Sequence, residues 1–302
     1  MRLPGIPHCA LPLTPWSCCG SFELLYLSKR DACEGIALCW RCTCALVEHT
    51  ELDLDSLVVE AATTPGREPL AFCEPTLPSE AARAAVLPYA TGSVALLARL
   101  RCAGGRELVV GTVHIHWDWH RPDLQTLQGA ITASALLRQA HAPGGPPVPA
   151  LLCGDFNTRP QAALYRLLSC GNLQPHELAV LRPDRPPASS KQPAAAAAAP
   201  AGARDGLVDR AWAGFALPDG CAFRSAYAEV LGKEPRLTNF TPYFTGCLDY
   251  IFMSQDECEN LRLRSVLRLP TRNDFHEMRL GGCPNARCSS DHLPLLAAFE
   301  WR

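Results

Sequence analysis

The chain has 302 residues, of which 48% are hydrophobic, and this suits one large domain or two modest ones with a substantial core. Its 28 basic and 30 acidic residues give a formal net charge of −2, which excludes a protein that holds nucleic acid by bulk positive charge alone. No stretch approaches the roughly 18 consecutive apolar residues of a membrane-spanning helix, so we expect no membrane partner.

The amino-terminal region is rich in cysteine, with seven of the 16 cysteines in the first 44 residues. Secreted disulfide frameworks are short and cysteine-dense, so this long, apolar chain predicts reduced thiols and an intracellular location. The cytoplasm is the expected compartment, with the mitochondrion and the nucleus as alternatives. Cys39-x-x-Cys42 has the spacing of half a zinc site, but no second pair follows at a finger-like distance, and residues 34–41 fit a strand better. We expect residues 1–21 to be irregular and residues 22–302 to form one domain.

Beyond residue 34, short apolar runs alternate with turn signals. Residues 108–116 predict a buried strand, and a helix with Asp123 as its N-cap follows. Residues 148–153 predict a second strand, and residues 161–168 predict a second helix that Gly171 closes. This strand–helix–strand–helix order is typical of a sheet covered by helices.

Residues 182–204 interrupt this pattern. They include six consecutive alanines between prolines and cannot bury enough apolar surface to order themselves, which predicts a disordered insert in a surface loop. A second structured stretch is expected from about residue 206 to a final strand that ends at Trp301.

Polar side chains occur in or beside four apolar segments, at or near what we expect to be their carboxyl ends. They are His114, His116, Asp155, Asn157, Asp249, Asp291 and His292. Each has an ordinary explanation as a cap, a turn residue or a satisfied histidine. Their shared placement favours one ligand site, because ligands gather at strand ends in layered α/β proteins. Carboxylate and amide oxygens suit Mg²⁺, and histidines can act as acid or base.

The motifs Gly154-Asp-Phe-Asn-Thr-Arg-Pro160, Gly246-Cys-Leu-Asp-Tyr-Ile-Phe252 and Ser290-Asp-His292 follow each other in the order of a known family. The chain resembles the endonuclease–exonuclease–phosphatase superfamily and, within it, the messenger-RNA deadenylase branch that includes nocturnin, the angel proteins and 2′,5′-phosphodiesterase. His114-Ile-His-Trp-Asp118 and Thr238-Asn-Phe240 add to the likeness. The resemblance implies a four-layered α/β sandwich, two packed sheets flanked by helices, that hydrolyses phosphodiesters with Mg²⁺, for which Mn²⁺ can substitute.

The resemblance also implies roles for the polar residues. Asp155 would orient or deprotonate the attacking water, and Asn157 would hold the phosphate. Asp291 would orient the imidazole of His292 and is the candidate metal ligand, while Asp249 and His114 would steady the transition state. On the substrate side the candidates are Phe244, which would stack an adenine, together with Asn239 and His116.

Three departures from the family pattern bear on activity. Thr112 stands where the family has an asparagine, and Trp119 stands where it has a proline. A Leu-Gln-Glu segment, whose glutamate is the family's principal metal ligand, is absent from residues 1–33. The resemblance therefore implies either part of an active enzyme, without its amino-terminal strands, or a degenerate member.

Three functions stay open on the sequence. The favoured one is a Mg²⁺-dependent 3′–5′ exoribonuclease acting on poly(A) or oligoadenylate, with adenine-rich RNA 3′ ends as its partner. The second is the same fold acting on another phosphoester, and the third is a catalytically impaired RNA-binding or scaffold protein. The printed residues contain no leucine-rich repeats, so we do not expect recruitment to a complex through such a segment.

Overall fold

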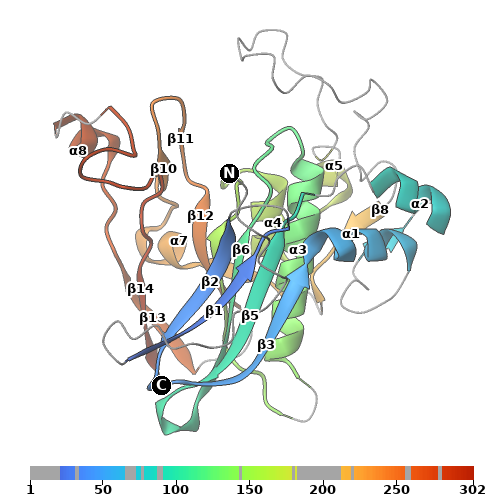
Figure 1. The fold of residues 1–302 in the computed structure, drawn as a ribbon, viewed down its shortest axis with the longest axis horizontal. Coiled ribbons are helices and arrows are strands. Elements are labelled where there is room, and N and C mark those ends of the chain that lie inside the picture. Colours follow the sequence, from blue (N-terminus) through green and yellow to red (C-terminus); the bar gives the residue numbers. More distant parts are fainter. Residues whose placement is uncertain are drawn as a thin grey trace, which may run out of the picture.

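The computed structural model describes residues 21–30, 34–64, 73–75, 78–86, 91–142, 145–178, 181, 212–218, 221–255, 260–277 and 281–302. The irregular segment predicted at 1–21, except for its last residue, and the insert predicted at 182–204 both lie outside these residues. Figure 1 shows a central sheet with helices along one side and smaller hairpins along the other.

The central sheet has six strands in the order β3-β5-β6-β7-β12-β9. They are β3 (Ala45–Asp53), β5 (Val94–Arg101), β6 (Glu107–His114), β7 (Ala150–Asp155), β12 (Asp249–Ser254) and β9 (Phe223–Ser225). Only β6 and β7 run parallel, because the helix α3 (Pro122–Ala140) carries the chain back between them. The other neighbours pair antiparallel.

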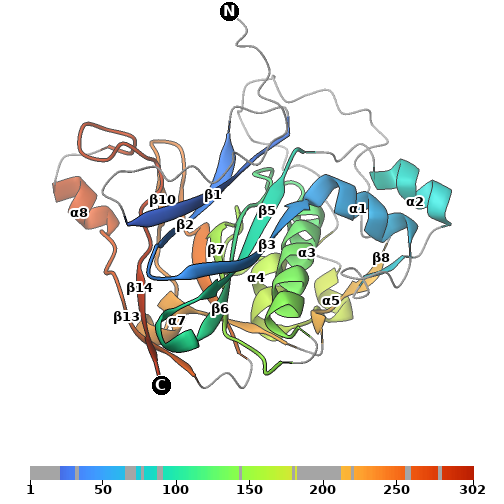
Figure 2. The ribbon, with the colours of Figure 1, turned by 60° about the horizontal axis from the view of Figure 1, so that its bottom comes forward.

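Helices cover one face of this sheet. These are α1 (Leu54–Thr63), α3 and α4 (Ala163–Cys170), with α2 (Ser79–Val86) and α5 (Pro175–Leu178) at the same end of the sheet (Figure 2). Leu127 and Ile131 of α3 belong to one buried cluster with Val109, Leu152 and Phe252 of the sheet. The main core therefore lies between α3 and strands β6, β7 and β12.

Hairpins form a second β layer on the opposite side. Strands β1 (Phe22–Ser28) and β2 (Gly35–Arg41) pair antiparallel, and Leu25, Ile36 and Trp40 pack against Leu96 and Ala98 of β5. A further antiparallel pair is formed by β13 (Leu261–Val266) and β14 (Ala297–Trp301), and α7 (Ala226–Leu231) contacts both β12 and β13. The predicted α/β sandwich of packed β layers with helices is confirmed, and so is the strand predicted at 34–41.

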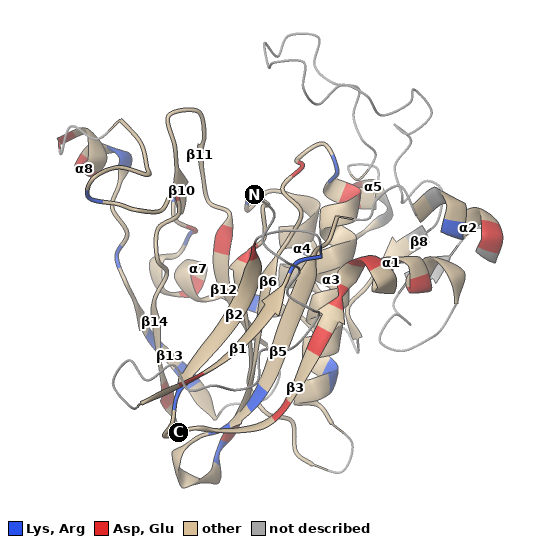
Figure 3. Ribbon diagram, in the orientation of Figure 1, with Lys and Arg blue, Asp and Glu red and all other residues tan. Residues whose placement is uncertain are grey.

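Smaller elements complete the described chain. They are β4 (Cys73–Pro75) with β8 (Trp212–Phe215), the 3₁₀ turn Ala103–Gly105, β10 (Asn239–Phe240) with β11 (Thr245–Gly246), and α8 (Arg272–Glu277). None of the described helices is long and apolar enough to cross a membrane. Basic and acidic residues are interspersed along the ribbon, in keeping with the net charge of −2 (Figure 3).

Several predicted boundaries were wrong. The strand predicted to reach residue 116 ends at His114, so His116 lies outside β6. The His116 N–H donates to the side-chain oxygen of Gln128 and not to a neighbouring strand. Asp123 is not a cap but sits inside α3, where its carboxylate pairs with Arg121. Gly171 closes α4 in a left-handed conformation, as predicted. Within the described part of the chain, Cys39 and Cys42 are exposed free thiols outside any metal-ligand cluster.

Gly154 allows β6 and β7 to approach closely just before Asp155. Its φ is 139°, and a Cβ there would lie 2.0 Å from the carbonyl oxygen of Val113. We predict that Gly154→Ala lowers the free energy of unfolding by about 3 kcal/mol, because the two strands must separate. Gly145→Ala, at an exposed position with open space around its Cβ, should change it by about 0.5 kcal/mol or less. Equal effects in urea unfolding would contradict this account.

Candidate active site

Strand register places three of the predicted residues in one row. In the parallel pairing of β6 with β7, His114 lies opposite Asp155, and in the antiparallel pairing of β7 with β12, Asp155 lies opposite Asp249. Paired residues on neighbouring strands project from the same face of a sheet. Asp249 begins its strand and does not end it, so the predicted placement at carboxyl ends was wrong for this residue. The antiparallel direction of β12 is what brings its first residue to the end of β7.

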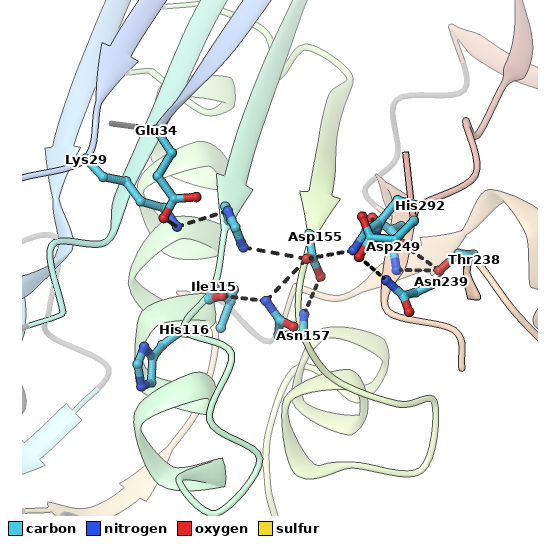
Figure 4. Close-up of polar contacts among 12 residues, drawn as sticks. Lys29, Glu34, Ile115, His116, Asp155, Asn157, Thr238, Asn239, Asp249 and His292 are labelled. Atoms are coloured by element: carbon cyan, nitrogen blue, oxygen red, sulfur yellow. Dashed lines mark hydrogen bonds and ion pairs between the residues drawn. The ribbon is translucent and has the colours of Figure 1, made fainter. Parts of the chain in front are cut away.

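The turn after β7 fixes Asp155. The N–H of Asn157 donates to Asp155 Oδ1 at 2.8 Å, and its side-chain Nδ2 lies 3.2 Å from Oδ2. The same Nδ2 donates to the carbonyl of Ile115 at 2.8 Å, while Gln125 of α3 donates to the Asn157 carbonyl. Asn157 has a φ of 46°, which asparagine tolerates better than most residues. Asn157 therefore links Asp155 to Ile115, directly after β6 (Figure 4), and to Gln125 of α3.

Asp249 and His292 form a hydrogen-bonded pair. Nδ1 of His292 lies 2.8 Å from Asp249 Oδ2, and the hydroxyl of Thr238 donates to the same oxygen at 2.6 Å. The prediction that Asp291 orients His292 was wrong, because the Asp291 carboxylate accepts instead from Asn239 Nδ2 at 3.2 Å. Asp291 directly precedes His292 in sequence, but its side chain bonds the β10–β11 hairpin through Asn239.

Burial and charge shift the proton affinities within the row. Burial and then the charge of Asp249 raise the pKa of Asp155 to about 7. The hydrogen bond to Asp249 is the main cause that raises the pKa of His292 to about 9. Burial and the neighbouring Lys29 lower the pKa of His114 below its ordinary value. At neutral pH the site thus combines an imidazolium, a neutral imidazole and a carboxyl group with a proton affinity suited to base catalysis.

Lys29 is a residue of the site that the sequence analysis missed. It follows β1, its side chain is only 10% exposed, and its Nζ lies 2.9 Å from His114 Nδ1 and 3.1 Å from Glu34 Oε1. An ammonium group can only donate, so His114 must accept at Nδ1 and carry its proton on Nε2. That nitrogen lies 3.6 Å from Asp155 Oδ2. No motif surrounds Lys29, and its contact with His114 spans 85 positions of sequence.

The donor set fits a divalent cation. Asp155, Asp249 and His292 each offer one ligand atom, and these three atoms lie within 4.8 Å of one another. Two carboxylates suit a hard cation, and an imidazole is a common third ligand for transition metals. Among the residues that the structure describes, Asp291 does not join this group, and its role as a metal ligand stays a prediction.

The substrate-side candidates are placed differently from one another. Asn239 lies beside the row, since its backbone forms a bridge with His292. The ring of Phe244, across the β10–β11 hairpin, faces the guanidinium of Arg159 at 5.3 Å. The ring of His116 lies apart from the row in Figure 4, and its nearest recorded aromatic neighbour is Trp117.

Comparison with known proteins assigns the fold and these motifs to one family. Residues 68–292, which include the whole row and His292, match the Endonuclease/Exonuclease/phosphatase family. The chain belongs to this family. Its resemblance to the deadenylase branch is confirmed as well, because the relatives below include proteins of that branch.

Three relatives illustrate the match. The chain is 30% identical over 217 residues to the CCR4-Not complex 3′-5′-exoribonuclease subunit Ccr4 of Saccharomyces cerevisiae, covering 69% of this chain and 22% of that protein. It is 24% identical over 201 residues to 2′,5′-phosphodiesterase 12 of Homo sapiens, covering 65% and 27%. The crystal structure of ANGEL2, a 2′,3′-cyclic phosphatase, superposes with a TM-score of 0.63 at 21% identity, covering 92% and 74%. The chain thus spans only about a quarter of the length of the curated relatives it matches.

The pairing of His292 with Asp249 predicts a titration. We expect Asp249→Asn to lower the pKa of His292 from about 9 toward its ordinary value of 6.5, because the hydrogen bond and the charge that raise it most are lost while burial still disfavours the cation. Asp291→Asn, the matched control, should lower it much less, because Asp291 acts on the imidazole only through charge. Nuclear magnetic resonance titration of the imidazole would measure both.

The same pairing sets a pH window for stability. The folded-state pKa of His292 is raised, so its contribution to the free energy of unfolding is complete below about pH 6.5 and is lost as the pH rises through about 9. The stability difference between the wild type and Asp249→Asn should shrink across that range. If Asp249→Asn and Asp291→Asn lowered the pKa of His292 equally, Asp249 would not be its partner.

Proposed function

We propose that the chain is a Mg²⁺-dependent phosphodiester hydrolase that shortens RNA from its 3′ end, with poly(A) or 2′,5′-oligoadenylate as substrate. The observation that carries the proposal is the row of His114, Asp155 and Asp249 with His292 against it. The names of the Ccr4 and 2′,5′-phosphodiesterase relatives support the substrate class.

Asp155 acts as the base that orients and deprotonates the attacking water. Its Oδ1 already accepts the Asn157 N–H, which leaves Oδ2 directed toward the two histidines. A pKa of about 7 lets the carboxylate accept a proton near neutral pH and release it again afterwards. Asn157, whose amide N–H groups bond Asp155 and Ile115, positions this base in place of the phosphate contact that the family resemblance implies.

The two histidines supply hydrogen-bond donors around the same oxygen. Nε2 of His292 lies 3.8 Å from Asp155 Oδ2, and Nε2 of His114 lies 3.6 Å from the same oxygen. His114 belongs to β6, which pairs with β7 on the side away from β12. Both N–H groups can donate to phosphoryl oxygens as negative charge develops on them. A divalent cation held by the carboxylates of Asp155 and Asp249 would supply further positive charge at the phosphate, while the N–H groups of His292 serve as hydrogen-bond donors.

Phe244 and Asn239 bind the terminal adenosine in this proposal. Phe244 offers a half-buried ring on the hairpin that also carries Asn239, and a base–aromatic stack contributes roughly 1–3 kcal/mol. Since Asn239 bridges to His292, a base stacked on Phe244 would have its phosphate near the catalytic row.

The test is cleavage of 5′-labelled oligo(A) and of 2′,5′-linked oligoadenylate, each with Mg²⁺, with Mn²⁺ and with a chelator. We expect laddered shortening that needs the metal and falls by roughly 10²–10⁴-fold in Asp155→Asn, because the base is lost while the side-chain shape is kept. Asp53→Asn is the matched control, since asparagine also caps a helix such as α1 and Asp53 lies outside the site.

The outcome separates the three functions that the sequence leaves open. Binding of oligo(A) without cleavage of either linkage would contradict the proposal and support an RNA-binding or scaffold role. Metal-dependent hydrolysis of another phosphoester, with both oligonucleotides untouched, would keep the chemistry and replace the substrate.

A further inference from the structure

A cavity of about 410 Å³ lies beside the catalytic row, between the β10–β11 hairpin and α8. Tyr243 and Phe244 of the hairpin form one wall, and Arg272 and His276 of α8 form the facing wall. Figure 1 shows α8 and the hairpin next to each other at one end of the molecule. The mechanism proposed above uses only Phe244 from this cavity.

The cavity rests on a packed base. The rings of Phe240 and Phe275 lie 4.6 Å apart, and both residues belong to a buried cluster with Leu237, Cys283 and Leu293. This cluster fixes α8 on the strand that carries Asn239, so the two walls face each other in the folded protein.

The facing walls carry groups suited to a nucleotide. Tyr243 is 98% exposed, which presents its whole ring to solvent at the mouth of the cavity. Arg272 and His276 are exposed, and no described residue holds either in a recorded hydrogen bond or ion pair. The Oδ2 atom of Asp274 accepts from the N–H and hydroxyl of Thr271, and among the described residues Asp274 forms no ion pair with Arg272 or His276.

The cavity and the catalytic centre share the β10–β11 hairpin. Phe244 lines it and also faces Arg159, two residues beyond Asn157. The other strand of the same hairpin carries Asn239, which bridges to His292. A strand whose scissile phosphate lies at the row can continue upstream along the hairpin that carries Asn239, which brings nucleotides further upstream to the cavity walls with Tyr243 and Arg272.

We propose that this cavity binds a nucleotide of single-stranded RNA that lies upstream of the two nearest the 3′ end. Tyr243 stacks on its base, and Arg272 binds its phosphate. The inference rests on the proposed function, because it takes RNA as the substrate, and it adds that affinity depends on chain length beyond the dinucleotide. Stacking tolerates any base, so the cavity recognises a strand and not a sequence.

The experiment measures binding of fluorescein-labelled oligo(A) of two, three, four and six nucleotides by anisotropy, with chelator present so that no cleavage occurs. For the wild type we expect affinity to rise between two and four nucleotides. In Tyr243→Ala and in Arg272→Ala the rise should be about tenfold smaller, with less than a twofold change for the dinucleotide. Tyr243→Phe keeps the stacking ring and should bind as the wild type does.

Arg262→Ala is the matched control, because Arg262 is an exposed arginine of β13 that does not line the cavity. An unchanged length dependence in both cavity variants would overturn the proposal, and so would an equal loss for the dinucleotide and the hexanucleotide. Because chelator removes hydrolysis from the measurement, wild type that binds with the expected length dependence but never cleaves would refute the proposed function and leave the cavity assignment standing.

Discussion

The pairing of β7 with β6 on one side and β12 on the other is the constraint on which the site depends. It sets His114, Asp155 and Asp249 side by side, although 94 positions of sequence separate Asp155 from Asp249. A slip of one residue in either pairing would turn a side chain to the opposite face of the sheet. Gly154 permits the close approach of β6 that holds this register. The core between α3 and the sheet then keeps these strands in place.

Placing two half-buried carboxylates side by side is costly, and the surrounding groups offset that cost. Asp155 and Asp249 have side chains 17% and 16% exposed, so both carboxylates lose hydration, and the charge of Asp249 disfavours the charge of Asp155. His292 and Thr238 donate to Asp249, while Asn157 donates to Asp155. Burial and the neighbouring Asp249 raise the pKa of Asp155 to about 7, which suits this carboxylate to accept a proton from water.

The family resemblance carried by the motifs was enough to predict the sandwich, and the residue pattern was enough to predict the strand at 34–41 and the meeting of Asp155 with Asp249 and His292. Partner choice within the site was not predictable in the same way. Asp291 adjoins His292 in sequence, yet the imidazole bonds Asp249, 43 positions away, because the β10–β11 hairpin draws Asp291 toward Asn239. Lys29 escaped notice for a related reason, since a single lysine after a strand carries no signal until the β1–β2 hairpin packs on the sheet.

The central claim is that this row of side chains directs water onto phosphorus. Hydrolysis of oligo(A) in ¹⁸O-labelled water, followed by mass spectrometry of the released nucleotide, tests it most directly. Attack by water on the phosphodiester beside Asp155 predicts 5′-AMP with one ¹⁸O atom in its phosphate. Released nucleotide without the label, a product that carries its phosphate on the 3′ side, or no released nucleotide at all would contradict the account.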